Sequence, residues 1–195
     1  MPAIIDHDAR RAALAEIAAD LIAAQGLDAA TVRRLAQAAG FSTKVVSHYF
    51  TDKRALLLMT YRFAADNSAQ RAARSGSGRA ADARGGVLSL LPTNPAMLRN
   101  WKVWFAFWGY AISDAEFAAE QRRQVMRARG DVARALASDV AFRSLDGPAR
   151  ERAARELITL VIGVALQATF DPDEWPTPRQ TQPLLDRLEG LAAGN

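Results

Sequence analysis

The sequence predicts an all-α fold of about nine helices, because its apolar residues are spaced for helices almost throughout. They recur three and four positions apart, as with Ala13/Leu14 and Ile17/Ala18, which is the spacing of one helix face. Glycines and capping residues divide this pattern into segments of helix length. No alternating strand pattern of useful length is present, so we expect helices packed on helices.

The N-terminal part of the chain predicts four helices. The second is opened by Thr31 as its cap and closed by Gly40. The third extends over about 42–50. The fourth is capped by Thr51 and reaches about residue 74. These lengths and spacings describe a small module of short helices that leads into a long one.

The remaining part of the chain predicts a loop over 73–86 and then further helices. Their starts carry helix-opening signals, at Asn94–Pro95, at the capping box of Ser113 and Glu116, and at Gly147–Pro148. A Pro-rich loop over 171–180 precedes a last amphipathic helix over 181–191.

Composition narrows the class of protein. The 195 residues suit one large domain, or a small module joined to a larger one, and the net charge of +4 permits nucleic acid or an anionic ligand as partner. No apolar run approaches the roughly 20 residues that span a bilayer. The N-terminus lacks the basic-then-apolar plan of a secretory signal. With no cysteine in the chain, we expect a cytoplasmic protein without a membrane partner.

The segment 42–50 has two distinct faces. Val46 and Phe50 lie four residues apart and face inward, and Tyr49 lies at the border. The outward positions are polar, at Thr43, Lys44, Ser47 and His48. Two short helices joined by a glycine turn, the second polar outside, describe a helix-turn-helix that fits the DNA major groove. From spacing alone, an ordinary amphipathic surface helix remains an alternative.

The stretch from about Arg10 to Leu57 resembles the DNA-binding domain of the TetR family of bacterial repressors. The shared features occur in the family's order, at Gly26, Thr31, Ala36, Gly40, His48–Tyr49–Phe50 and Asp52–Lys53–Arg54–Ala55–Leu56. The resemblance implies a three-helix DNA-binding domain over 1–51 and a helical effector-binding and dimerisation domain over 52–195. It implies a DNA-facing set of Thr31, Arg33, Ser42, Thr43, Lys44, Ser47, His48, Tyr49 and, as the phosphate clamp, Lys53.

The C-terminal half resembles the ligand domain of the subgroup that includes the choline-responsive repressor of betaine synthesis. Residues 100–124 and 160–176 carry this resemblance. Close relatives often have an acid just before the glycine of the second stretch, where this chain has Ile162. That departure weighs against a simple cationic effector.

The helix expected over 95–112 is rich in aromatic residues. Plain core packing explains such a helix, since one that is apolar nearly all round is buried. Alternatively, its rings line a cavity for an apolar or quaternary ammonium effector, because Trp and Tyr faces attract cations. The candidates for this wall are Met59, Phe63, Trp101, Trp104, Phe105, Trp108, Gln167 and Phe170. Gln167 is expected to be a buried amide that needs a partner.

The last two long helices carry apolar stripes. The resemblance implies that they pack against their copies in a homodimer, through Leu157, Val161, Val164, Leu184 and Leu188. Alternatively, these stripes are buried against other helices of the same subunit. A dimer of helix-turn-helix modules reads two major grooves roughly 34–36 Å apart on a pseudo-palindrome.

These observations favour a ligand-responsive transcriptional regulator, and repression is the mode of regulation that we expect. An enzyme is disfavoured, because the chain has two histidines, no cysteine and no clustered metal ligands, and we predict no catalytic residue, no metal and no cofactor. Asp171, Asp173 and Glu174 are better explained as solvated turn residues. A helical adaptor that has lost DNA binding is a third class, and the presence of Lys44, Tyr49 and Lys53 argues against it.

Overall fold

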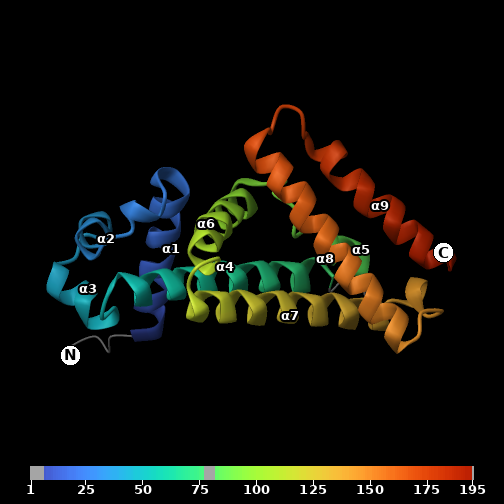
Figure 1. Ribbon diagram of the computed structural model, residues 1–195, viewed down its shortest axis with the longest axis horizontal. Helices are drawn as coiled ribbons and strands as arrows, with labels where there is room; N and C mark the ends of the chain where they lie inside the picture. The colour runs from blue at the N-terminus through green and yellow to red at the C-terminus, as the bar shows by residue number, and fades with distance from the viewer. Residues whose placement is uncertain (1–6, 77–81, 195) are drawn as a thin grey trace, which may run out of the picture. The chain divides into compact units, whose positions relative to one another are not determined.

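The computed structural model describes residues 7–76 and 82–194, and within these ranges it contains nine α-helices, two 3-10 turns and no strand (Figure 1). The all-α prediction is thereby confirmed. The helices are α1 (His7–Gln25), α2 (Val32–Ala39), α3 (Thr43–Tyr49), α4 (Lys53–Ser75), α5 (Ala83–Leu88), α6 (Pro95–Ala111), α7 (Ala115–Ser138), α8 (Gly147–Phe170) and α9 (Thr177–Ala193). The 3-10 turns are η1 (Leu27–Ala29) and η2 (Val140–Phe142).

The chain forms two compact units whose limits differ from the expected division at residues 51 and 52. The first unit extends to Asp66 and also contains Lys102–Glu120. The second contains Asn67–Trp101 and the chain from Gln121 onward. The first unit therefore contains α1–α3, the N-terminal part of α4, the C-terminal part of α6 and the start of α7. The division into a DNA-binding region over 1–51 and an effector region over 52–195 concerns function and stays a prediction.

The turn between α2 and α3 has the expected chemistry. Thr31 Oγ1 accepts a hydrogen bond from the Arg34 amide at 3.2 Å and opens α2. Gly40 ends α2 in the left-handed region, with φ at +67°, which glycine adopts without the steric penalty of a Cβ. Ser42 Oγ accepts from the Val45 amide at 3.3 Å and opens α3. Three local signals thus position two short helices for a helix-turn-helix.

Two other helix starts differ from prediction. Asp52 Oδ1, and not Thr51, accepts a hydrogen bond at the start of α4, from the Ala55 amide at 2.7 Å. The predicted capping box at the start of α7 is also wrong, because Asp114 Oδ1 accepts from the amides of Glu116 and Phe117, at 3.0 and 3.1 Å. A carboxylate so placed is charged and favoured by the helix dipole, so it outcompetes the neighbouring hydroxyl.

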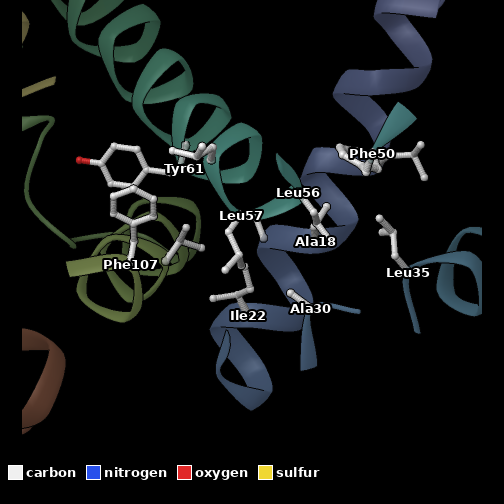
Figure 2. Close-up of a cluster of buried hydrophobic side chains, with 14 of the residues drawn as sticks. Ala18, Ile22, Ala30, Leu35, Phe50, Leu56, Leu57, Tyr61 and Phe107 are labelled. Atoms are coloured by element: carbon white, nitrogen blue, oxygen red, sulfur yellow. The ribbon is translucent and has the colours of Figure 1, made fainter. Parts of the chain in front are cut away.

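The core of the first unit lies between α1, the helix-turn-helix and the start of α4 (Figure 2). Phe50 and Leu35 are buried there with Ala18, so the helix-turn-helix is anchored to α1 by apolar contacts. Tyr61 stacks on Phe107 with their ring centroids 3.9 Å apart. Burial of Tyr61 raises the pKa of its phenol above the ordinary value. This core fixes α3 on a rigid support.

The second unit contains a helix where a loop was predicted. Asp82 accepts from the Gly85 amide at 2.8 Å and opens α5, so the loop prediction over 73–86 is wrong at its C-terminal end. The buried Asp139 accepts from the Ala83 amide at 2.9 Å and holds the start of α5. The central part of that prediction, at 77–81, lies outside the described residues.

Helices α8 and α9 pack against each other within the second unit (Figure 1). Asp146 opens α8 by accepting from the Ala149 amide at 2.7 Å. Helix α9 begins at Thr177, so the loop predicted over 171–180 is shorter than expected. By length and composition α8 is apolar enough to cross a membrane, and 44% of its apolar window is buried within the chain.

Candidate DNA-binding surface and effector residues

Helix α3 turns its polar side chains outward, as predicted. Val46 and Phe50 are 0% and 2% exposed and anchor the helix, while Tyr49 is half-buried at the edge. The exposed residues of this segment are Ser42, Thr43, Lys44, Ser47 and His48. A short helix held by two buried anchors, with hydroxyl, ammonium and imidazole groups outward, presents donors suited to base edges and phosphates.

Helix α2 contributes two of the predicted residues. Arg33 is exposed and its guanidinium carries five N–H donors in a fixed geometry. Thr31 is half-buried, and its hydroxyl oxygen already accepts the capping hydrogen bond from Arg34. The hydroxyl hydrogen of Thr31 is still available as a donor, so capping and contact with a phosphate are compatible.

Lys53 has a local anionic partner that the sequence analysis missed. Its Nζ lies 3.0 Å from Oδ1 of Asp28, which belongs to η1. The side chain of Asp28 is 96% exposed, so water and salt screen this pair and its net contribution to stability is small. The ammonium that we expect to clamp a phosphate therefore holds a carboxylate in the free protein.

His7 also joins this surface, from the first residue of α1. Its Nδ1 lies 3.0 Å from the Tyr49 hydroxyl oxygen. The His7 ring centroid is 6.0 Å from that of His48 and 5.9 Å from that of Tyr49. No local pattern signals this contact, because 42 positions separate His7 from Tyr49 along the chain.

Arg54 binds two carboxylates from the start of α7. Its Nη1 and Nη2 contact the two oxygens of Asp114 at 2.5 and 2.6 Å, and its Nε contacts Glu116 at 2.7 Å. The guanidinium also lies over the Phe117 ring, 4.7 Å from its centroid. Hydrogen bonding to Arg54 lowers the pKa of Asp114 from 3.8 to about 2. This bidentate contact ties α4 to α7 within the first unit.

The candidate effector residues belong to both units. Met59, Phe63, Trp104, Phe105 and Trp108 are partly buried in the first unit, where Phe105 and Trp108 meet edge to face. Trp101, in the second unit, is 3% exposed and donates from Nε1 to the Leu90 carbonyl at 2.8 Å. Gln167 and Phe170 are exposed on α8, so the expectation that Gln167 is a buried amide is wrong.

The second unit contains a buried polar contact that the sequence analysis missed. Asn100 on α6 donates from Nδ2 to the Ser68 hydroxyl on α4 at 2.9 Å. Ser68 in turn lies 3.6 Å from the Met97 sulfur. Asn100 and Ser68 are 2% and 3% exposed, so these are specific polar groups in an apolar interior. Among the residues that the structure describes, no group of His, Cys, Asp and Glu is arranged to hold a metal.

The residues expected at a dimer interface lie inside the second unit. The five residues are at most 6% exposed in this single chain, namely Leu157, Val161, Val164, Leu184 and Leu188. The opposite face of α8 is exposed and contains Thr159, Gly163, Leu166 and Phe170. A Cβ added at Gly163 would meet nothing within 4 Å, so this part of the face is open.

Two family profiles match the chain. One, described as "BetI-type transcriptional repressor, C-terminal", matches residues 79–193. The other, described as "Bacterial regulatory proteins, tetR family", matches residues 14–59. The first covers more than half of the chain, and the second spans the helix-turn-helix.

Curated relatives match over nearly their whole length. The HTH-type transcriptional regulator PksA of Bacillus subtilis is 29% identical over 196 residues, covering 98% of this chain and 94% of that protein. The HTH-type transcriptional regulator BetI of Paraburkholderia phytofirmans is 29% identical over 201 residues, covering 99% of this chain and 98% of that protein.

Solved structures share the fold. A transcriptional regulator from Rhodococcus sp. Rha1 superposes with a TM-score of 0.78 at 26% identity, covering 95% of this chain and 96% of that one. A transcriptional regulator from Saccharomonospora viridis, solved in complex with choline, superposes with a TM-score of 0.77 at 21% identity, covering 94% of this chain and 97% of that one. The second likeness bears on the fold alone.

Proposed function

Because the chain belongs to the TetR family of bacterial regulatory proteins, which are ligand-responsive DNA-binding regulators of transcription, we propose that it is a repressor acting as a homodimer on a pseudo-palindromic operator. A small molecule bound in its C-terminal region alters its affinity for that operator. Such coupling is limited to the difference in effector affinity between the two states, about 1–3 kcal/mol.

The outward polar face of α3 carries the DNA-binding part of the proposal. Buried Val46 and Phe50 anchor the helix, so Lys44 and Ser47 project from a rigid element. The N-terminal residues of such a helix lie nearest the base edges, while flanking groups contact phosphates and set the register. We assign Lys44 and Ser47 to the groove and Tyr49 to the phosphate backbone.

A gel shift on DNA that flanks the protein's own gene tests this assignment. A discrete shift that weakens steeply with salt and survives competitor DNA supports a sequence-specific regulator. The Lys44→Ala, Tyr49→Ala double variant is expected to lose this shift. A control that changes exposed residues of the same kinds elsewhere in the first unit, Lys102→Ala with Tyr110→Phe, is expected to keep it. Equal binding by both double variants would remove α3 from the DNA interface.

The effector that we propose is apolar or carries a quaternary ammonium group. The partly buried rings of Trp104, Phe105 and Trp108 support either class, because aromatic faces attract both apolar groups and cations. The BetI-type match over residues 79–193, together with the resemblance to the choline-responsive subgroup, favours the cation, and Ile162 in place of the usual acid argues against it.

Isothermal titration with choline, betaine aldehyde and an uncharged apolar compound separates the two effector classes. Heat with choline that disappears in Trp104→Ala, Trp108→Ala would support the cationic class. Heat only with the apolar compound would contradict it. Leu98→Ala, which changes the same helix in the second unit, is the matched control for loss of packing on α6.

For the homodimer we propose the exposed face of α8 as part of the interface. The apolar side chains of Leu166 and Phe170 are 40% and 76% exposed in the single chain. Gly163 lies on the same face and has no side chain, so a second helix can approach closely there. The stripe that includes Leu157 and Leu184 is already covered inside the chain, so it supports the fold of each subunit. The same proposal treats the protein as cytoplasmic and without enzymatic activity, as is typical of such regulators.

A further inference from the structure

His7, His48 and Tyr49 form a cluster of three rings at the C-terminal end of α3. The Tyr49 hydroxyl lies 3.0 Å from His7 Nδ1, and the His48 and Tyr49 centroids are 5.4 Å apart, edge to face. Both histidines are exposed, and Tyr49 is half-buried. His7 therefore contacts the residue that we assign to a DNA phosphate, although it belongs to a different helix.

The direction of the hydrogen bond between His7 and Tyr49 depends on the proton at Nδ1. When Nδ1 has no hydrogen, it accepts the only hydroxyl hydrogen of Tyr49, which then points inward. When His7 is an imidazolium, both ring nitrogens carry hydrogen, so Nδ1 donates to the Tyr49 oxygen. The Tyr49 hydrogen is then directed outward and can be donated to an anionic oxygen.

We infer that His7 is a positioning residue for DNA binding: its imidazolium form fixes the Tyr49 hydroxyl as an outward donor to a DNA phosphate, so that the protein takes up a proton when it binds DNA. The inference rests on the proposed function, because it requires Tyr49 at the phosphate backbone. A neutral ring with its hydrogen at Nδ1 also donates to Tyr49, but the charged imidazolium is the stronger donor. A phosphate bound to the Tyr49 hydroxyl therefore favours the imidazolium, and proton uptake follows.

Several other charged groups of this region have partners of their own, while Lys44 is exposed on α3. On α1, Asp8 pairs with Arg11 at 3.7 Å. At the start of α4, Asp52 accepts from a backbone amide, and Lys53 pairs with Asp28. From α3, the groups that face His7 are Tyr49 and the titratable ring of His48. A test must therefore separate the contribution of His7 from that of His48.

The test measures DNA affinity against pH in the full-length protein, in four variants: wild type, His7→Phe, Tyr49→Phe and the double variant. Nonspecific duplex DNA at low salt is the probe, because the contact is with the backbone and needs no operator. Histidine side chains titrate near pH 6.5, so affinities are compared at about pH 6 and about pH 8.5. Phe replaces the ring of His7 without a titratable group, and His48 is present in all four proteins. Thermal unfolding checks that each variant is folded.

We expect His7→Phe to weaken DNA binding roughly fivefold near pH 6, the size of one net hydrogen bond, and less than twofold near pH 8.5. In the Tyr49→Phe background the effect of His7→Phe near pH 6 is expected to disappear. A His7 effect that persists in that background would reflect only the charge of the imidazolium and would overturn the positioning role. Parallel pH profiles for wild type and His7→Phe would overturn it as well.

The same data separate this inference from the proposed function. If Tyr49→Phe weakens DNA binding while His7→Phe changes nothing, the positioning role fails and the DNA-facing assignment stands. If Tyr49→Phe leaves the affinity unchanged at both pH values, Tyr49 does not contact DNA, and both the inference and that part of the proposed surface fail.

Discussion

The guanidinium of Arg62 on α4 holds the buried carboxylate of Glu120 on α7. Its Nη2 and Nε lie 2.6 and 3.0 Å from the same oxygen of Glu120. The two side chains differ in burial, since that of Arg62 is 50% exposed and that of Glu120 is 2% exposed. Hydrogen bonding to Glu120 raises the pKa of Arg62 above its ordinary value. A surface cation thus stabilises an acid inside the first unit.

We expect Arg62→Ala to lower the free energy of unfolding by about 2–3 kcal/mol, because Glu120 stays buried after losing its cation. This loss is smaller than that expected for a fully buried ion pair, because the side chain of Arg62 is half exposed. Urea denaturation measures the change. Arg187→Ala, which removes the partner of the exposed Glu156, is the control and is expected to cost less than about 1 kcal/mol. Adding Glu120→Leu to Arg62→Ala is expected to recover most of the loss. Equal losses in the two Arg variants would contradict this account.

The lowered pKa of Asp114 predicts a specific dependence of stability on pH. Its pKa is lowered in the folded protein to about 2, so its contribution is fully present above about pH 4 and is lost as the pH falls toward 2. In Asp114→Asn this contribution is absent at every pH. The urea midpoint of the variant is therefore expected to fall less steeply than that of wild type over this range. Identical slopes for the two proteins would show that Arg54 does not favour the ionised form.

Gly40 and Gly109 are expected to respond to alanine in opposite directions. Gly40 has a φ of +67°, so Gly40→Ala forces a Cβ into the left-handed region at a cost of about 1 kcal/mol. Gly109 lies in α6, and a Cβ there meets nothing within 4 Å, so Gly109→Ala is expected to stabilise by up to about 1 kcal/mol through helix propensity. Thermal unfolding of the two variants is the measurement. Stabilisation by Gly40→Ala would contradict the turn geometry.

The proposed dimer face on α8 is tested by charge. Leu166→Asp with Phe170→Asp places carboxylates where two copies would meet, and we expect dimerisation to weaken at least a hundredfold, about 3 kcal/mol. Sedimentation equilibrium gives the dissociation constant. Val140→Asp changes another exposed apolar residue of the second unit and is the control, expected to leave dimerisation unchanged. An unaffected dimer in the double variant would place the interface elsewhere.

Local signals predicted the fold well, because a cap or a turn is decided by residues a few positions apart. Thr31 and Gly40 act as the sequence indicates, and α3 begins directly after Ser42, close to its expected start. The capping residue of α7 was harder to predict, because Ser113 and Asp114 are both suited to cap a helix and Glu116 completes the capping-box pattern with Ser113. The structure gives the cap to Asp114 and turns Glu116 to Arg54, which lies 62 positions away.

The functional surfaces depend still more on distant residues. The pairing of His7 with Tyr49 has no local pattern, so sequence reasoning assigned no role to His7. The stripes of α8 and α9 were correctly identified as apolar, but periodicity does not say which partner covers them. Leu157 and Leu184 are covered inside the chain, while Gln167, expected to be buried, is exposed.

The pair of Lys53 and Asp28 has a consequence for how tightly the protein holds arbitrary DNA. In the proposed complex, a phosphate that binds Lys53 replaces a carboxylate that the protein itself supplies. Part of the charge of Lys53 is neutralised before DNA arrives, so this lysine releases less of the DNA counterion atmosphere than an unpaired one would. Asp28 then acts as an internal competitor of the nucleic acid: because the pair is exposed and screened, it weakens every encounter by the same small amount and leaves selection between sequences to the residues of α3.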